Sequence, residues 1–258
     1  MPRYRKPPIV EAWIGIDFAP KPSKVSWHED EGRFRSEVHA EFPRAQFFFS
    51  SELQVEESED GSIPIIKDHQ KKLDLIRMRT EDGKRVLQLG DDRMAVNTLE
   101  GGADYAGFDS LLAETIRHLK TYRRIYEPVS VRKVTTHLTD IIEIPIGEVP
   151  AEIEDYFAIA RNLPENPFGM TTGVAIHYQT EAPHDQQPMN VGLGRVPSGS
   201  PQMLRFRMDW EKSSTIDGEF DEDSLKSVLT TDNDFLVDCF ESSLTPRTLD
   251  LFEPLNRN

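Results

Sequence analysis

Two histidines on predicted strands are the residues best placed for acid–base or metal chemistry. His137 and His177 each occupy a polar position in a segment where apolar and polar residues alternate, as in a strand with one buried face. If the two strands are neighbours, both imidazoles and a carboxylate of Asp140 or Glu143 could form a metal site or an acid–base pair. In a regular strand Glu143 shares the face of His137, whereas Asp140 faces the other way. The alternative is that both histidines are ordinary polar strand residues.

A second candidate is the acidic pair Asp91 and Asp92, followed by Arg93. Adjacent strand residues point to opposite faces, so both carboxylates can bind one metal only at a bulge, which Gly90 permits. The alternative is a salt bridge at a strand end, with Arg93 or Arg77 as the partner. Together with the two histidines, the three residues 91–93 are the candidates for catalysis.

Candidate binding residues lie on a predicted helix and on a predicted strand. One side of the helix carries Arg117, His118, Lys120, Arg123 and Arg124. Such a face could bind an anion, an acidic partner or the acidic C-terminal segment of the same chain, and the alternative is a solvated face. Trp13 lies on the polar face of the strand predicted at 10–18, which makes it a candidate contact for a partner.

The motifs of several common catalytic classes are missing. There is no P-loop, no Gly-x-Ser-x-Gly elbow and no His-Glu-x-x-His pair, and the stretch Gly192-x-Gly194 lacks the third glycine of a dinucleotide-binding loop. The acidic run 219–223 lacks the ligand spacing of a calcium loop. The single cysteine, Cys239, excludes a disulfide framework, and its place on an apolar helix stripe indicates a buried structural thiol. We therefore expect no metal and no cofactor.

The elements that must position these residues follow from the hydrophobic periodicity. Alternation predicts strands at 10–18, 46–55, 73–80, 85–95, 134–146, 170–178, 189–193 and 204–210, and Asp82-Gly83 predicts a hairpin turn. Apolar spacings of three and four predict a short helix within 28–42 and a long one from Phe108 to before Pro128. Further helices are expected from Pro150 through Ala160, from a cap at Asp232 or Asn233, and from Thr245-Pro246.

The order of elements repeats. Residues 1–128 and 129–258 each read as strand, helix, about three antiparallel strands and a longer helix. The sequence thus predicts a pseudo-duplicated α+β protein that forms one compact unit. Strands with one apolar face need helices on one side only, so we expect a curved antiparallel sheet backed by two long helices. TATA-box-binding-like and helix-grip folds share this order, an analogy of fold that carries no function.

Length and charge bound the remaining possibilities. The chain has 258 residues and a formal net charge of −15, with acidic residues concentrated in 28–60 and 208–258. A field of this sign repels phosphate backbones, so nucleic acid is not the expected partner. No apolar stretch is long enough to span a membrane, and the basic N-terminus leads into no apolar segment of a signal peptide. We expect a cytoplasmic protein.

The opening residues 6–12, Lys-Pro-Pro-Ile-Val-Glu-Ala, resemble those of a sporadically distributed bacterial family of about this length whose activity is uncharacterised. The segments 86–93, 131–145 and 240–245 support the resemblance, which spans nearly the whole chain. It implies one full-length unit and a bacterial source, and it suggests a link to a defence or toxin–antitoxin-like locus. It supplies no catalytic residue.

These observations favour a binding or regulatory protein over an enzyme. We expect the open sheet face to hold a protein or peptide partner, or a second copy of the chain, with charge asymmetry steering the encounter. The alternative is a small-molecule-binding protein or hydrolase with a site between the two halves, built from residues 91–93 and the two histidines. A deep pocket that contains two or more of these residues would favour the alternative.

Overall fold

The computed structural model describes residues 4–19, 27–56, 65–90, 92–99, 101–126, 130–146, 153–162, 175–183, 185–216 and 221–255. Within these residues, nine strands form one sheet in the order β2-β3-β4-β5-β1-β6-β9-β8-β7, and all neighbouring strands are antiparallel. The strands are β1 (Ile9–Phe18), β2 (Arg44–Glu56), β3 (Ile65–Arg79), β4 (Arg85–Gly90), β5 (Arg93–Thr98), β6 (Val131–Pro145), β7 (Ala175–Glu181), β8 (Pro188–Val196) and β9 (Met203–Thr215). The α+β class and the antiparallel sheet are confirmed.

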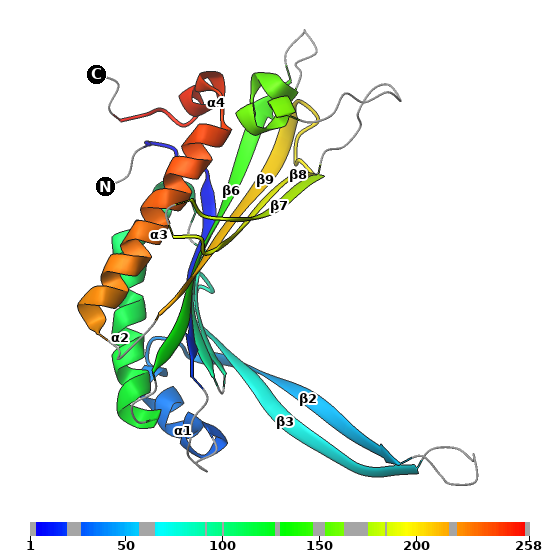
Figure 1. Ribbon diagram of the computed structural model, residues 1–258, viewed down its shortest axis with the longest axis vertical. Coiled ribbons are helices and arrows are strands. Elements are labelled where there is room, and N and C mark those ends of the chain that lie inside the picture. The colour runs from blue at the N-terminus through cyan, green and yellow to red at the C-terminus, as the bar shows by residue number, and fades with distance from the viewer. Residues whose placement is uncertain are drawn as a thin grey trace.

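The two halves of the chain meet in the middle of this sheet. Strand β1 pairs with β6 along most of its length, with Ile14 opposite Thr136 and Trp13 opposite His137. Figure 1 shows β7 and β8 at one end of the sheet and the long β2–β3 hairpin projecting at the other, so that the face between them is open. Because the strands of both halves hydrogen-bond to one another, the halves share a single sheet.

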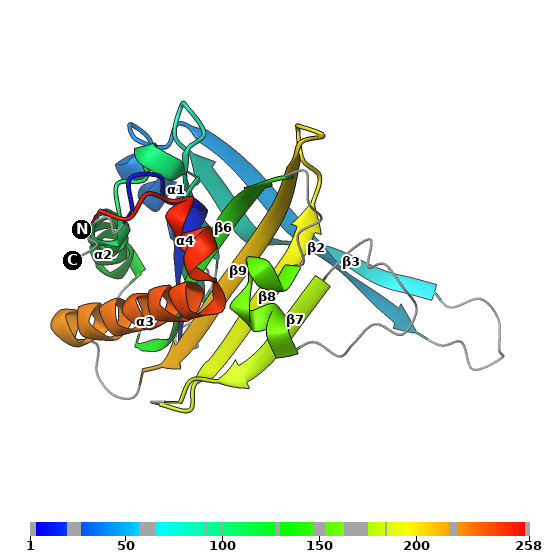
Figure 2. The same ribbon diagram turned by 90° about the horizontal axis from the view of Figure 1, so that it is seen from above.

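The helices lie on one face of the sheet. They are α1 (Trp27–Val38), α2 (Phe108–Tyr126), α3 (Glu222–Ser243) and α4 (Pro246–Asp250), with short 3-10 helices η1 (Gly102–Asp104), η2 (Ile153–Asp155) and η3 (Ala158–Asn162). Helix α2 packs on β1 and β5, and α3 packs on β6 and β9. Figure 2 shows both long helices on the same side, with the β2–β3 hairpin pointing away from them.

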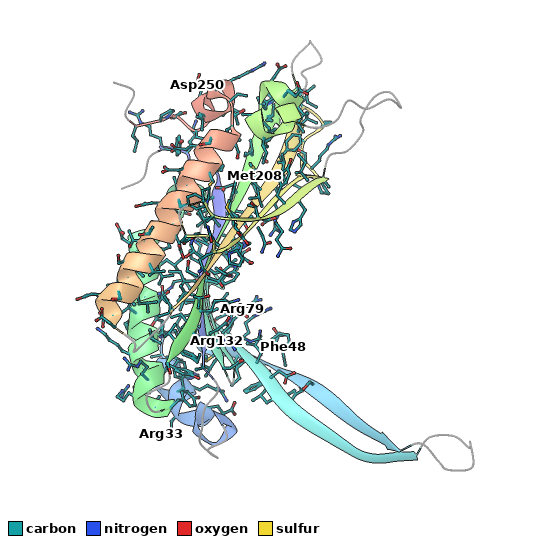
Figure 3. All side chains as sticks on the ribbon, viewed as in Figure 1. Arg33, Phe48, Arg79, Arg132, Met208 and Asp250 are labelled. Atoms are coloured by element: carbon teal, nitrogen blue, oxygen red, sulfur yellow. The ribbon has the colours of Figure 1, made fainter. Side chains whose placement is uncertain are left out.

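The core lies between the sheet and these helices. The even-numbered residues of β1 from Ala12 to Phe18 are fully buried there, and Phe18 stacks on Tyr122 of α2 with ring centroids 4.4 Å apart. Figure 3 places Met208 of β9 in the same layer and Phe48 on the hairpin side that faces the open side of the sheet. One face of each central strand is therefore apolar and covered, as the alternation predicts.

Several predicted boundaries are wrong. Helix α3 begins at least eleven residues earlier than expected because the Asp221 carboxylate accepts a hydrogen bond from the Ser224 backbone N–H at 2.8 Å and caps the helix. Asp232 lies inside this helix, so it is no cap. The strand expected at 85–95 is two strands, β4 and β5. The helix expected from Pro150, itself outside the described residues, is replaced over 153–162 by the two short 3-10 helices.

No helix among the described residues is long and apolar enough to cross a membrane.

Candidate functional site

The open face, the side of the sheet away from the helices, carries a compact group of polar and aromatic side chains at its centre. We call Trp13, His137, Thr139, Asp209 and Glu211 the His137 cluster. Trp13 of β1 lies opposite His137 of β6, which in turn lies opposite Glu211 of β9, and Thr139 lies opposite Asp209. Directly opposed residues of antiparallel strands point to the same face, so the register itself brings the five together.

His137 lies between two carboxylates. Its Nε2 is 3.7 Å from Oδ1 of Asp209, and its Nδ1 is 3.6 Å from Oε2 of Glu211. Burial lowers the pKa of His137, but the interactions with Asp209 and Glu211 outweigh burial, so the pKa lies above its usual value. The two carboxylates therefore favour the cationic form of the imidazole.

The hydroxyl of Thr139 sets the direction of the hydrogen bonds. It donates to Oδ1 of Asp209 at 2.8 Å, and it lies 3.1 Å from Nε2 of His137. Since its single proton is directed to Asp209, the hydroxyl accepts a hydrogen bond from the Nε2–H of His137. Nδ1 of His137 is buried and has no hydrogen-bond partner among the described residues.

Outer residues hold the two carboxylates in the ionised form. Nε of Arg207 donates to both oxygens of Asp209 at 2.9 and 2.8 Å, and Nδ2 of Asn190 donates to Glu211 at 3.0 Å. Burial raises the pKa of Asp209, yet His137, Arg207 and Thr139 together bring it well below its usual range. His137 and Asn190 lower the pKa of Glu211 against a smaller effect of burial. Both groups are anions at neutral pH.

Trp13 lies flat over the sheet. Its ring stacks on the imidazole of His137, with centroids 5.2 Å apart and planes 16° from parallel. A Cβ added at Gly15 would lie 2.7 Å from Cζ3 of Trp13, so only glycine leaves room for the indole in this position. On the other side of the cluster, Gly192 and Gly194 of β8 lie opposite Asp209 and Arg207. Glycines on both sides leave the centre of the open face free of tall side chains.

This arrangement suits recognition better than nucleophilic catalysis. A hydroxyl nucleophile must donate its proton to the histidine that activates it. Thr139 instead donates to Asp209, and the nearby hydroxyls of Thr135 and Ser213 lie 2.9 Å apart and bond to each other. What the cluster does offer is an imidazole whose cationic form is favoured, two carboxylates and a partly exposed indole on one face of the sheet.

The structure separates the two histidines. Strands β9 and β8 lie between β6, which carries His137, and β7, which carries His177. The expected pairing of these residues is therefore wrong, because it required neighbouring strands. Asp140 lies on the helix-covered side, as expected, and Glu143 lies with its carboxylate 3.6 Å from Nε of Arg205. Neither carboxylate joins the His137 cluster.

The acidic pair does not form a described site. Asp91 lies outside the described residues. Asp92 and Arg93 are exposed at the break between β4 and β5, where the backbone carbonyl of Asp92 accepts a hydrogen bond from the N–H of Phe18 at 2.7 Å. The described part of this segment thus extends the pairing of β1 with β5 through its backbone.

Cations on α2 bind acidic partners within the chain. Arg117 pairs with Glu41 at 2.9 Å, and Arg124 forms two hydrogen bonds with Glu37 of α1 at 3.1 and 2.9 Å. Lys120 pairs at 2.9 Å with Glu222 at the start of α3, which belongs to the acidic C-terminal segment. Arg123 is half-buried. The face binds acidic groups of its own chain.

One group of side chains could reach a metal ion. Oxygens of Glu41 and Glu114 and a ring nitrogen of His118 all lie within 4.8 Å of one another. However, Arg85 contacts Glu41 at 2.6 Å and Glu114 at 3.3 Å, and Arg117 also binds Glu41. Two guanidinium groups already neutralise these carboxylates and would repel a second cation. His118, expected on the basic face, is instead buried against Phe42.

Sequence reasoning missed the carboxylates of the His137 cluster. The apolar positions 204–210 predicted strand β9, and the intervening residues Arg205, Arg207, Asp209 and Glu211 form a charged row on its other face. That row is a readable signal, but nothing local indicates that it lies beside His137. No family model and no curated protein matches the chain.

Proposed function

We propose that this chain is a binding protein whose open face holds a segment of a partner protein. The observation that carries the proposal is the nine-stranded sheet with its described helices on one face only and the His137 cluster at the centre of the other. A sheet face without covering helices is normally polar, but it does not normally carry a flat-lying indole over a glycine. Half-exposed tryptophans are enriched among the residues that dominate binding energies.

The charges favour a basic segment. The net charge is −15, and Glu11, Asp209 and Glu211 lie near Trp13 on the open face. Lysine and arginine side chains of a partner would find carboxylate acceptors around the indole, and the net charge would speed the encounter. The same charge opposes nucleic acid and a second copy of this chain as occupants.

A hydrolase with a site between the halves is less well supported. The cavity between the two halves, about 400 Å³, is lined by none of the candidates His137, His177, Asp92 and Arg93. Thr139, the hydroxyl next to His137, has its proton directed away from the imidazole. This cavity therefore does not meet the condition that the hydrolase hypothesis sets, which is a pocket that contains two or more of its candidate residues.

The pseudo-duplication remains our proposal for how the fold arose. Its support is the arrangement about the β1–β6 pair: β5, β4 and β3 follow β1 outward on one side, and β9, β8 and β7 follow β6 on the other. The second helices correspond too, since α2 packs on β1 and β5 while α3 packs on β6 and β9. The family resemblance, the fold analogy, a cytoplasmic location and a defence-like locus also stay predictions.

The test is a comparison of variants in affinity capture. The tagged chain is incubated with a lysate of its source cells, and bound proteins are quantified by mass spectrometry for wild type, Trp13→Ala and Lys226→Ala. Lys226 pairs with Glu222 on α3, far from the open face, and serves as the matched control. We expect one protein to be retained by wild type and Lys226→Ala and to fall at least about tenfold with Trp13→Ala.

Salt dependence tests the basic character of the partner. Retention should fall as salt rises from low to physiological ionic strength, because exposed charges are then screened. Retention that is equal in wild type and Trp13→Ala contradicts the proposal, as does a wild-type chain that retains no protein above the untagged background.

A further inference from the structure

A second candidate site lies on the opposite side of the sheet, between the two halves of the chain. A cavity of about 400 Å³ is bounded by the N-terminal segment Pro7–Ile9, the loop and first turn at 105–109, strand β6 and one side of α3 from 230 to 240. This volume is in the range of pockets that hold small organic ligands. Pro7, Pro8 and Ile9, which belong to the opening motif, line this cavity. None of the three belongs to the His137 cluster.

The carboxylate of Asp140 projects into this cavity without a partner. The residue is only 6% exposed, it lines the cavity, and no described residue gives its side chain a hydrogen bond or an ion pair. A buried carboxylate without a donor is costly, so such a group calls for an explanation. Burial, reinforced by the charge of Asp209 and opposed by His137, raises the pKa of Asp140 to about 8.

The other polar groups around the cavity are also acceptors or neutral. Asp109 and Asp234 lie at its rim, Tyr105 lies within it, and the described residues that line it include no lysine, arginine or histidine. Burial and the charges of Asp140 and Asp109 raise the pKa of Tyr105, which keeps its phenol neutral. Asp109 also sits in the first turn of α2 and balances the positive end of that helix.

The walls between these groups are apolar and aromatic. Tyr4, Phe108 and Phe240 line the cavity together with Leu138 and Val237. Aromatic faces attract cations and also bind the hydrocarbon body that carries them. Among its described residues, the cavity thus combines an apolar wall with three aspartates and no positively charged side chain.

We propose that this cavity binds an organic cation, an ammonium or guanidinium group on an apolar body, with its charge held by Asp140. The source of the cation is either a free small molecule or a lysine or arginine side chain of another protein. On binding, neutral Asp140 releases its proton to solvent and the carboxylate pairs with the cation. The site does not depend on the function of the open face.

The test uses probes whose charge does not titrate. Isothermal titration calorimetry of the full chain is performed with phenethylguanidinium, and with the neutral isostere phenethylurea as the control. A guanidinium stays protonated throughout, so any pH dependence belongs to the protein. We expect the guanidinium to bind at one site, the urea to bind at least tenfold more weakly, and close to one proton to be released near pH 7.

Variants assign the binding to Asp140. Asp140→Asn keeps the shape of the side chain and removes its charge, and we expect at least a tenfold loss of affinity together with loss of the proton release. Asp234→Asn, at the rim, should weaken binding only two- to threefold because its carboxylate is exposed. Asp223→Asn, an exposed carboxylate of α3 that does not line the cavity, should bind like wild type.

A peptide probe identifies the source of the cation. Binding of an acetylated tripeptide with a central arginine is compared with binding of the same peptide with citrulline in place of arginine. Binding of the arginine peptide points to a protein side chain, and binding of phenethylguanidinium alone points to a free small molecule.

The proposal is overturned if neither cation binds at millimolar concentration, if phenethylurea binds equally well, or if Asp140→Asn leaves the affinity unchanged. A folded Asp140→Asn variant is verified by its cooperative unfolding in urea.

Discussion

Two carboxylates on the helix-covered side of the sheet, Asp232 and Asp140, are equally buried and have opposite surroundings. Asp232 of α3 is 1% exposed, receives Nζ of Lys212 at 2.6 Å and the hydroxyl of Ser214 at 2.8 Å, and shares Lys212 with Asp185. Asp140 of β6 is 6% exposed and receives no described donor.

The difference separates a structural charge from a ligand site. The Lys212–Asp232 pair joins strand β9 to helix α3 and has its polar atoms satisfied within the chain, as a stable buried ion pair requires. The carboxylate of Asp140 is also buried, but no described residue gives it a hydrogen bond or an ion pair. An unpaired buried carboxylate of this kind is expected where a ligand supplies the missing partner.

Removing the positive charge of Lys212, which pairs with Asp232 of α3, should cause the largest loss of stability. Lys212→Met leaves Asp232 buried with only the Ser214 hydroxyl, and we expect the free energy of unfolding to fall by about 3–5 kcal/mol. Urea denaturation measures the change. In the double variant Lys212→Met with Asp232→Leu, most of the loss should be recovered because no unpaired charge remains. A loss below about 1 kcal/mol in the single variant would show that the pair is not structural.

Removing the charge at Asp140 should have the opposite effect and raise the free energy of unfolding. An aspartate in the unfolded chain ionises near pH 4, whereas Asp140 ionises at about 8 in the fold. The folded state therefore binds the extra proton between these values, and this group lowers stability as pH rises by about 1.4 kcal/mol per unit.

Asp140→Asn lacks this loss, so it should equal wild type near pH 4 and exceed it by about 4 kcal/mol at pH 7, three pH units higher. Urea midpoints of both proteins across this range provide the measurement. A variant that is less stable than wild type at every pH would mean that the carboxylate is stabilised within the fold.

His137 on the open face should show a smaller effect with the reverse dependence on pH. Its pKa is raised by Asp209 and Glu211, so its contribution is full below the unfolded value of about 6.5 and is lost as pH rises through the folded pKa. His137→Gln should lower the free energy of unfolding by roughly 1–2 kcal/mol more at pH 5.5 than at pH 9. Equal losses at the two pH values would assign the effect to stacking on Trp13 instead.

The exposed pair Arg124–Glu37 should matter least. Its guanidinium binds the carboxylate in two places, yet both side chains are open to water, where such pairs contribute little. Arg124→Ala should leave the urea midpoint unchanged within error. A shift comparable to that of Lys212→Met would remove the basis for ranking ion pairs by burial.

Local patterns explain which parts of the fold could be anticipated. Strand β1 and helix α2 match their expected ranges because their apolar residues recur at the periods of a strand and a helix, and Asp82-Gly83 supplies the turn between β3 and β4. The start of α3 was misplaced because Asp221 and Asp232 are both plausible caps, and only packing shows that Asp232 binds Lys212.

The sequence by itself determined the α+β class, the alternation that sends Trp13 and His137 to one face of their strands, and the acidic net charge. The tertiary structure alone decided which strands are neighbours. Strand β9 lies beside β6, so His137 meets Asp209 and Glu211 rather than His177. The same pairing leaves Asp140 facing a cavity between α3 and the N-terminal segment. Periodicity acts within a segment, whereas strand order depends on how distant segments bury their apolar faces together.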